Sequence, residues 1–161
     1  MSLWNIFKHA DSSGKIALTL STWFGTGLLP GVPGTFGTLA AVPLTLAIGS
    51  LAIRQKAIAL VIIIIVAIWS SGRAQDLLRK KDPSEVVIDE VAGFVLTMLL
   101  LPTTSLAFVL GFTLFRFFDI LKPFPIRHLE KIRGGFGIVF DDLLAGVYAF
   151  AGVEIMLNLL R

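Results

Sequence analysis

The chain has 161 residues, of which 55% are hydrophobic and only 16% are charged, and its mean hydropathy is +0.85. A soluble domain usually carries about 25% charged residues, so this composition excludes a disordered chain and indicates a small polytopic membrane protein. The formal net charge of +3 argues against a nucleic-acid-binding protein. The absence of cysteine excludes disulfides, thiolate metal sites and cysteine nucleophiles. The length allows one domain, which we assign to residues 1–161.

The first 29 residues are not expected to form a complete membrane span. Residues 1–15 lack the apolar core and the cleavage site of a secretory signal peptide, and we expect them to form a cytoplasmic segment. Residues 16–29 are interrupted by hydroxyl residues and glycines. We therefore predict a short interfacial or re-entrant element there, with a full crossing as the alternative.

Five apolar segments follow, and each is predicted to cross the bilayer, whose hydrocarbon core takes roughly 20 residues of helix. They are Phe36–Ile53, Ala57–Ser70, Val86–Leu101, Ser105–Phe118 and Gly137–Leu160. Pro43 lies inside the first segment and is expected to kink it. The sequence thus predicts an all-α membrane bundle of about five transmembrane helices plus the short N-terminal element.

The distribution of basic residues predicts the orientation of this bundle. Five spans place the loops 30–35, 73–85 and 119–136 on one side of the membrane. The two longer loops hold most of the basic residues, namely Arg73, Arg79, Lys80, Lys81, Lys122, Arg127, Lys131 and Arg133. Arg54, Lys56 and Arg161 are left for the opposite side. Because basic loops stay inside, we expect the loops 73–85 and 119–136 to face the cytoplasm.

Charged residues also occur at membrane depth, where each costs about 2.5–3.5 kcal/mol on insertion scales. They are Asp89, Glu90, Arg116, Asp119, Asp141 and Asp142. In the predicted topology each lies near the cytoplasmic end of its helix, so three remote segments bring carboxylates to one layer of the membrane. An all-oxygen ligand set suits Mg²⁺ or Mn²⁺ better than Zn²⁺. We therefore expect a hard cation at this layer.

The residues that precede Asp89 have the pattern of a helix start. Asp82, Pro83 and Glu85 fit the N-cap, N1 and N3 positions, so Asp82 is predicted to cap the helix. Glu85 and Asp89 would then share one face of that helix. Asp89 lies too far along the helix for a capping role, which leaves a metal ligand or a buried ion pair with Arg116.

The adjacent acids Asp141 and Asp142 repel each other unless a cation stands between them. Ala145 and Gly146 follow one helical turn later. Small residues at these positions allow a neighbouring helix to approach the two carboxylates closely. The pattern therefore indicates a metal-binding pair at a tight helix crossing.

A glycine-rich loop leads into the first predicted span and holds five glycines between residues 25 and 37. Free backbone N–H groups before a helix N-terminus offer a site for an anion. The spacing matches neither the P-loop nor the dinucleotide fingerprint. A phosphate site at Gly34, Thr35, Gly37 and Thr38 and a flexible turn therefore both remain open.

Arg116 and Asp119 are three residues apart and share a helix face. Pro123 disfavours helical geometry at Lys122, so the span is predicted to end there with Lys122 at the interface. Arg127, farther along the same loop, is interpreted as an ordinary basic residue of a cytoplasmic loop.

Together these motifs resemble the phosphatidylglycerophosphatase A family of bacterial membrane lipid phosphatases. The matching stretches are PGTFGT at 33–38, KDPSEVVIDEVAG at 81–93, FRFFDILKPFPI at 115–126 and DDLLAG at 141–146. The resemblance covers residues from about 25 to 150. It implies Mg²⁺-dependent hydrolysis of the terminal phosphomonoester of phosphatidylglycerophosphate to phosphatidylglycerol. It also implies a site that faces the cytoplasm from the bacterial inner membrane.

For that reaction we predict a role for each polar residue. The catalytic residues are Asp89, Asp142, Arg116 and Lys122. The Mg²⁺ ligands are Glu85, Asp89, Asp141 and Asp142, and the supporting or alternate positions are Glu90, Asp119 and Asp82. The phosphate-binding residues are Thr35, Thr38, Gly34 and Gly37.

Two alternatives remain open at this point. A small cation or proton transporter also uses intramembrane carboxylates, although acids gathered in one layer favour the phosphatase. Within the phosphatase, direct attack by water competes with a route through an aspartyl-phosphate.

Overall fold

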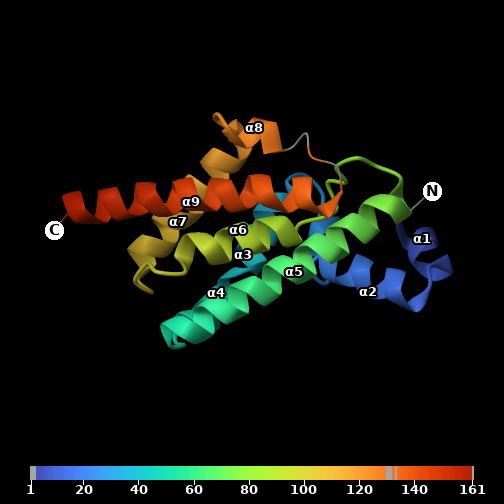
Figure 1. Cartoon of the computed structure of the whole chain (residues 1–161), viewed down its shortest axis with the longest axis horizontal. Coiled ribbons are helices and arrows are strands. Elements are labelled where there is room, and N and C mark those ends of the chain that lie inside the picture. The colour runs from blue at the N-terminus through green and yellow to red at the C-terminus, as the bar shows by residue number, and fades with distance from the viewer. Residues whose placement is uncertain (1–2, 130–131, 133, 161) are drawn as a thin grey trace.

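The computed structural model describes residues 3–129, 132 and 134–160, and the described residues form helices joined by short turns (Figure 1). The elements are α1 (Leu3–His9), α2 (Ser12–Ser21), η1 (Thr26–Leu28), α3 (Pro33–Ala40), α4 (Val42–Gly49), α5 (Ile53–Leu78), α6 (Ile88–Met98), α7 (Ser105–Leu121), α8 (Ile126–Leu129) and α9 (Gly135–Leu159). The predicted all-α class is confirmed.

Among the described residues, α5 and α9 are long and apolar enough to cross a membrane, judged by length and composition. Their 26 and 25 residues extend over about 38 Å at 1.5 Å per residue. The α3–α4 pair is a shorter apolar unit that runs from Pro33 to Gly49. The predicted element at residues 16–29 contains the second half of α2, a helix of 10 residues, and the short helix η1.

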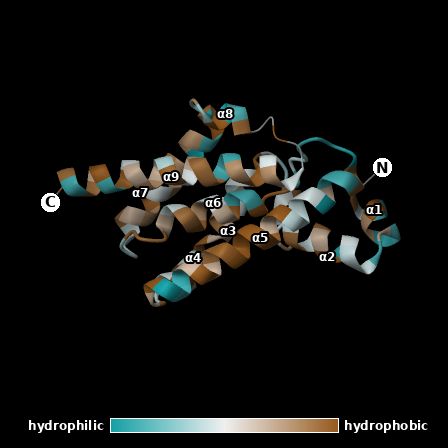
Figure 2. Ribbon diagram, in the orientation of Figure 1, coloured by the Kyte–Doolittle hydropathy of each residue, from teal (hydrophilic) through white to brown (hydrophobic). Residues whose placement is uncertain are grey.

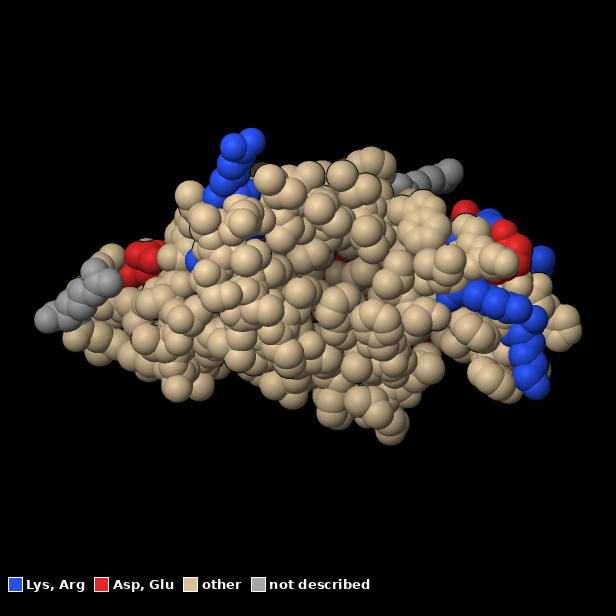
Figure 3. Space-filling view, turned by 90° about the horizontal axis from the view of Figure 1, so that it is seen from below, with Lys and Arg blue, Asp and Glu red and all other residues tan. Residues whose placement is uncertain are grey.

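The surface of α5 shows what surrounds the bundle. Five large apolar residues are 44–61% exposed along one stripe of this helix, namely Ile58, Val61, Ile62, Ile65 and Trp69. Their spacing of three or four residues puts them on one helix face, where the ribbon is strongly hydrophobic (Figure 2). Charged residues gather mostly toward the two ends of the face in Figure 3. An exposed apolar face on a helix long enough to cross a membrane suits contact with lipid.

Two predicted helix boundaries differ in the structure. The first span is divided into α3 and α4 at Ala41, because Pro43 has no N–H to donate and its ring collides with the preceding helical turn. The predicted start at Asp82 is wrong, because α6 begins at Ile88. The N–H of Val87 donates instead to the carbonyl of Ser21 at 2.8 Å, which holds the preceding residues against the end of α2.

Helix α6 lies at the centre of the bundle and crosses α9 closely (Figure 1). A Cβ on Gly93 would lie 2.6 Å from the carbonyl oxygen of Asp142, and one on Gly146 would lie 2.5 Å from the carbonyl oxygen of Gly93. Thr97 donates its hydroxyl to the carbonyls of Gly93 and Gly146 at 2.9 and 3.3 Å. The predicted close approach at Gly146 is confirmed. The crossing places Asp142 beside Asp89, because Asp89 lies one helical turn before Gly93 and Asp142 lies one turn before Gly146.

Candidate active site

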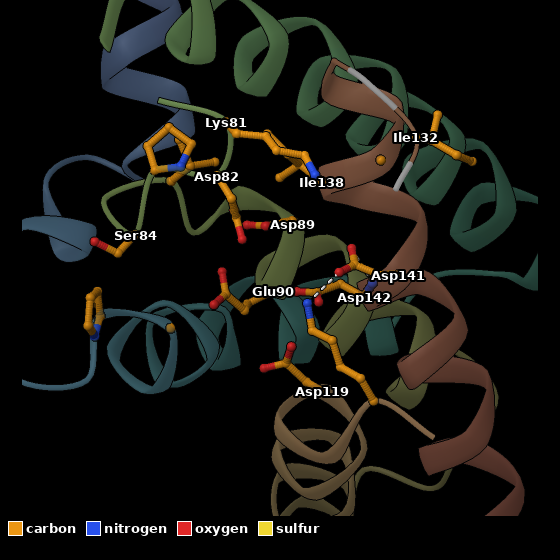
Figure 4. Close-up of a pocket in the computed structure, with 16 residues that line it drawn as sticks. Lys81, Asp82, Ser84, Asp89, Glu90, Asp119, Ile132, Ile138, Asp141 and Asp142 are labelled. Atoms are coloured by element: carbon orange, nitrogen blue, oxygen red, sulfur yellow. Dashed lines mark hydrogen bonds and ion pairs between the residues drawn. The ribbon is translucent and has the colours of Figure 1, made fainter. Parts of the chain in front are cut away.

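A cavity of about 250 Å³ opens where the ends of several helices meet (Figure 4). Its polar and backbone lining comes from α3 (Pro33, Gly34), the loop before α6 (Lys81, Asp82, Ser84), α6 (Asp89, Glu90), the end of α7 (Asp119, Lys122) and α9 (Asp141, Asp142). The predicted convergence of remote segments on one layer is therefore a feature of the fold.

Three carboxylates form the centre of this cavity. Asp89, Glu90 and Asp142 each offer one oxygen, and these oxygens lie within 4.8 Å of one another. Each of the three side chains also has a buried oxygen without a hydrogen-bond partner in the described structure. Burying an unpartnered carboxylate oxygen is costly. The cluster therefore offers oxygen ligands for a divalent cation, and a bound cation would give the unpartnered oxygens a partner.

Two basic side chains lie at the edge of the carboxylate cluster. Arg116 Nη1 contacts Asp119 Oδ2 at 2.6 Å and Glu90 Oε1 at 3.5 Å, as the spacing of Arg116 and Asp119 predicts. Lys122 Nζ contacts Asp141 Oδ2 at 2.6 Å, the ion pair drawn as a dashed line in Figure 4. These partly buried ion pairs hold both basic groups beside the acids.

The charges of the site do not balance. Of the described residues that line the cavity or pair with its acids, six are carboxylates and three are basic, if Arg116 is counted with the lining. Like charges in a partly dry space repel strongly. The excess of negative charge gives a second reason for a cation at this site.

The acids that form the central cluster differ from the metal ligands that the sequence predicts. Glu90, predicted only as a supporting residue, belongs to the central cluster. Glu85 instead pairs with Lys80 at 2.5 Å and does not line the cavity. Because α6 begins only at Ile88, Glu85 and Asp89 do not share a helix face, contrary to the prediction.

The structure also shows which ion pairs Asp141 and Asp89 do and do not form, which the residue spacing could not decide. Asp141 lines the cavity but is held by Lys122. The ion pairs of Arg116 go to Glu90 and Asp119, so the ion-pair alternative for Asp89 is not what the structure shows. Asp82 lines the cavity and caps no helix.

The glycine-rich segment reaches the cavity through Gly34, where an added Cβ would collide with Glu90 Oε1 and Arg116 Nη1. A larger residue would therefore displace these two side chains. Thr38 is fully buried and donates its hydroxyl to the Gly34 carbonyl at 2.8 Å. Gly37 packs on Val87, and Thr35 is absent from the lining. Gly34 and Gly37 thus allow close packing, and the phosphate-binding role of this segment stays a prediction.

The position of Lys122 follows from the end of α7. Lys122 adopts a left-handed conformation with φ 45°, and its N–H donates to the carbonyl of Phe118 at 2.9 Å. Pro123 then prevents the helix from continuing. The predicted end of this helix at Lys122 is confirmed, and its side chain reaches back to Asp141.

An apolar helix bundle that brings carboxylates, a guanidinium and an ammonium to one cavity has the side chains of the phosphoryl-transfer class of enzymes. The comparisons with known proteins agree with this class. A family model described as "Phosphatidylglycerophosphatase A" matches residues 19–157. The chain belongs to this family, and it is a lipid phosphatase of phospholipid metabolism.

Individual relatives support the same assignment. The chain is 37% identical over 133 residues to "Phosphatidylglycerophosphatase A" of Haemophilus influenzae, covering 81% of this chain and 82% of the relative. It is 35% identical over 136 residues to the protein of the same name from Escherichia coli, with 83% and 78% covered. A Bacteroides thetaiotaomicron protein named "Putative phosphatidylinositol-3-phosphatase" is 36% identical over 143 residues, with 84% and 89% covered. No solved structure matches the chain significantly.

Proposed function

We propose that this protein hydrolyses the terminal phosphomonoester of phosphatidylglycerophosphate, releasing phosphatidylglycerol and inorganic phosphate, with Mg²⁺ as its cofactor. The observation that carries the proposal is the cluster of Asp89, Glu90 and Asp142, with its unpartnered buried oxygens, beside Arg116 and Lys122. Membership in the phosphatidylglycerophosphatase A family supplies the substrate.

Asp89, Glu90 and Asp142 would hold the metal, because an all-oxygen donor set suits Mg²⁺. When bound, Mg²⁺ supplies positive charge that polarises the phosphate and favours ionisation of a water molecule. Asp141 stays with Lys122 in this assignment and keeps the ammonium oriented toward the cavity.

Arg116 and Lys122 bind the phosphate oxygens. The Nε of Arg116 is buried and makes no hydrogen bond within the described structure, so it can donate to a phosphate oxygen. Asp119 and Asp141 hold the two basic groups in place, so little reorganisation accompanies the reaction. Such preorganised charge stabilises the negative charge of the transferring phosphoryl group.

One carboxylate of the pair Asp89 and Asp142 accepts a proton from the attacking water. The water oxygen bonds to phosphorus while the phosphorus–oxygen bond to the glycerol breaks, and the leaving alkoxide takes the proton back from the carboxylate to give phosphatidylglycerol. The lipid tails stay in the bilayer throughout, so the cavity holds only the headgroup.

The proposal is tested by phosphate release from the detergent-solubilised protein. Phosphatidylglycerophosphate should be hydrolysed, EDTA should reduce the rate by about a hundredfold or more, and added Mg²⁺ should restore it. Phosphatidylinositol 3-phosphate serves as the comparison substrate, because one relative carries that name. A rate that EDTA leaves unchanged would contradict the metal assignment, and faster hydrolysis of phosphatidylinositol 3-phosphate would contradict the proposed substrate.

We also propose that the bundle crosses the bacterial inner membrane five times, with the site facing the cytoplasm. The five crossings would be the α3–α4 pair and helices α5, α6, α7 and α9. The loop residues 81–84 and the end of α7 border the same cavity, which supports a common side for the basic loops. Arg54 and Lys56 begin α5 at its other end.

Because the chain has no cysteine, single cysteines can report this topology directly. In intact cells, a membrane-impermeant thiol reagent should label Gln55→Cys, whereas Lys80→Cys should react only after the cells are permeabilised. The reverse pattern would overturn the orientation. Labelling of both positions in intact cells would contradict the crossing by α5.

A further inference from the structure

A second hollow lies beside the carboxylate cavity, at the turn that follows α7. It encloses about 390 Å³ and is lined by Leu121, Lys122, Pro123, Phe124, Arg127 and His128. Lys122 lines both spaces. The two spaces are therefore neighbours, with the Lys122 side chain at the border of both.

The two spaces differ in charge. Among the described residues that line the second hollow, none is acidic, whereas Lys122, Arg127 and His128 offer N–H donors. An arginine guanidinium binds phosphate oxygens through two parallel hydrogen bonds. The hollow therefore suits an anion, whereas the acids of the first cavity suit a cation.

The remaining walls of the hollow are mostly apolar and exposed on the surface of the protein. Leu121 is 54% exposed and Phe124 is 79% exposed. Phe117 and Ile120, also exposed, continue this apolar surface along α7. The turn is held in place because Tyr148 donates its hydroxyl to the carbonyl of Phe124 at 3.3 Å. The hollow thus lies between a polar cavity and an exposed apolar surface of α7.

We propose that this hollow binds the phosphodiester of the lipid substrate, with Arg127 as a specificity-determining residue. The inference rests on the proposed function, in which the terminal phosphate occupies the carboxylate cavity. The substrate carries a second phosphate beyond its glycerol bridge. With the monoester near Arg116 and Lys122, that diester lies near Arg127, and the acyl chains pass Leu121 and Phe124.

The experiment compares the wild-type protein with Arg127→Gln in detergent micelles. The variant should raise the KM for phosphatidylglycerophosphate about three- to tenfold with little change in kcat, since an exposed charge-assisted contact is lost. Inhibition by phosphatidylglycerol, which has the diester but no monoester, should weaken by a similar factor. Inhibition by inorganic phosphate that competes with the terminal monoester in the carboxylate cavity should stay unchanged. Arg127→Lys should recover part of the lost affinity.

Lys8→Gln provides the matched control, because it removes one exposed positive charge from α1, outside both spaces. An equal rise in KM for Lys8→Gln would show that any positive charge on the protein attracts the anionic substrate. That result would overturn the inference. So would a loss of inhibition by inorganic phosphate in Arg127→Gln. A wild-type protein that does not hydrolyse the lipid would instead overturn the proposed function, so the two failures are distinguishable.

Discussion

Asp142→Asn is expected to lower the rate of phosphate release by about a thousandfold without weakening the fold. The Asp142 side chain belongs to the central carboxylate cluster and has a buried oxygen without a hydrogen-bond partner. Asparagine keeps the shape of the side chain but removes a ligand charge and a proton acceptor. Because the change also relieves repulsion among crowded acids, the unfolding temperature in EDTA should stay the same or rise.

The measurement pairs turnover with thermal unfolding at increasing Mg²⁺. The wild-type protein should gain stability as the metal binds the folded state, and Asp142→Asn should gain much less. Asp76→Asn is the control, since Asp76 is exposed on α5 and does not line the cavity. Near-normal turnover of Asp142→Asn, with an undiminished response to Mg²⁺, would remove Asp142 from the site.

Gly146→Ala is expected to impair both stability and activity, because it forces α6 and α9 apart. The added Cβ would lie 2.5 Å from the carbonyl oxygen of Gly93, which is backbone and cannot turn aside. Overpacking of this kind costs about 1–3 kcal/mol. The same displacement moves Asp142 away from Asp89, and an error of about 1 Å in a catalytic site can cost about a hundredfold in rate.

Gly152→Ala on the same helix is the matched control for this substitution. Its Cβ would meet Leu114 Cδ1 at 2.8 Å, the end of a flexible side chain that can rotate away. Alanine also favours a helix over glycine by about 1 kcal/mol, so this variant should keep its unfolding temperature and its kcat/KM. Equal behaviour of the two variants would show that the crossing at Gly146 does not position the carboxylates.

The sequence by itself determined the features that depend on neighbours along the chain. The apolar composition predicted helices, because a helix pairs all the backbone hydrogen-bonding groups of one segment within that segment, as lipid demands. The spacing of Arg116 and Asp119 predicted their ion pair, and Pro123 predicted the end of α7 at Lys122. Ala145 and Gly146 predicted a close helix contact beside the two acids.

Only the tertiary structure decided which carboxylates meet. Val87 bonds to Ser21, far away in the sequence, so α6 starts late and Glu85 turns to Lys80. The crossing at Gly93 and Gly146 then sets Glu90 next to Asp89 and Asp142. Spacing along one helix fixes which residues share a face, but the partner of that face depends on contacts between helices. For this reason the acids could be named from the sequence, whereas their division among the central cluster, the lysine and the arginine could not.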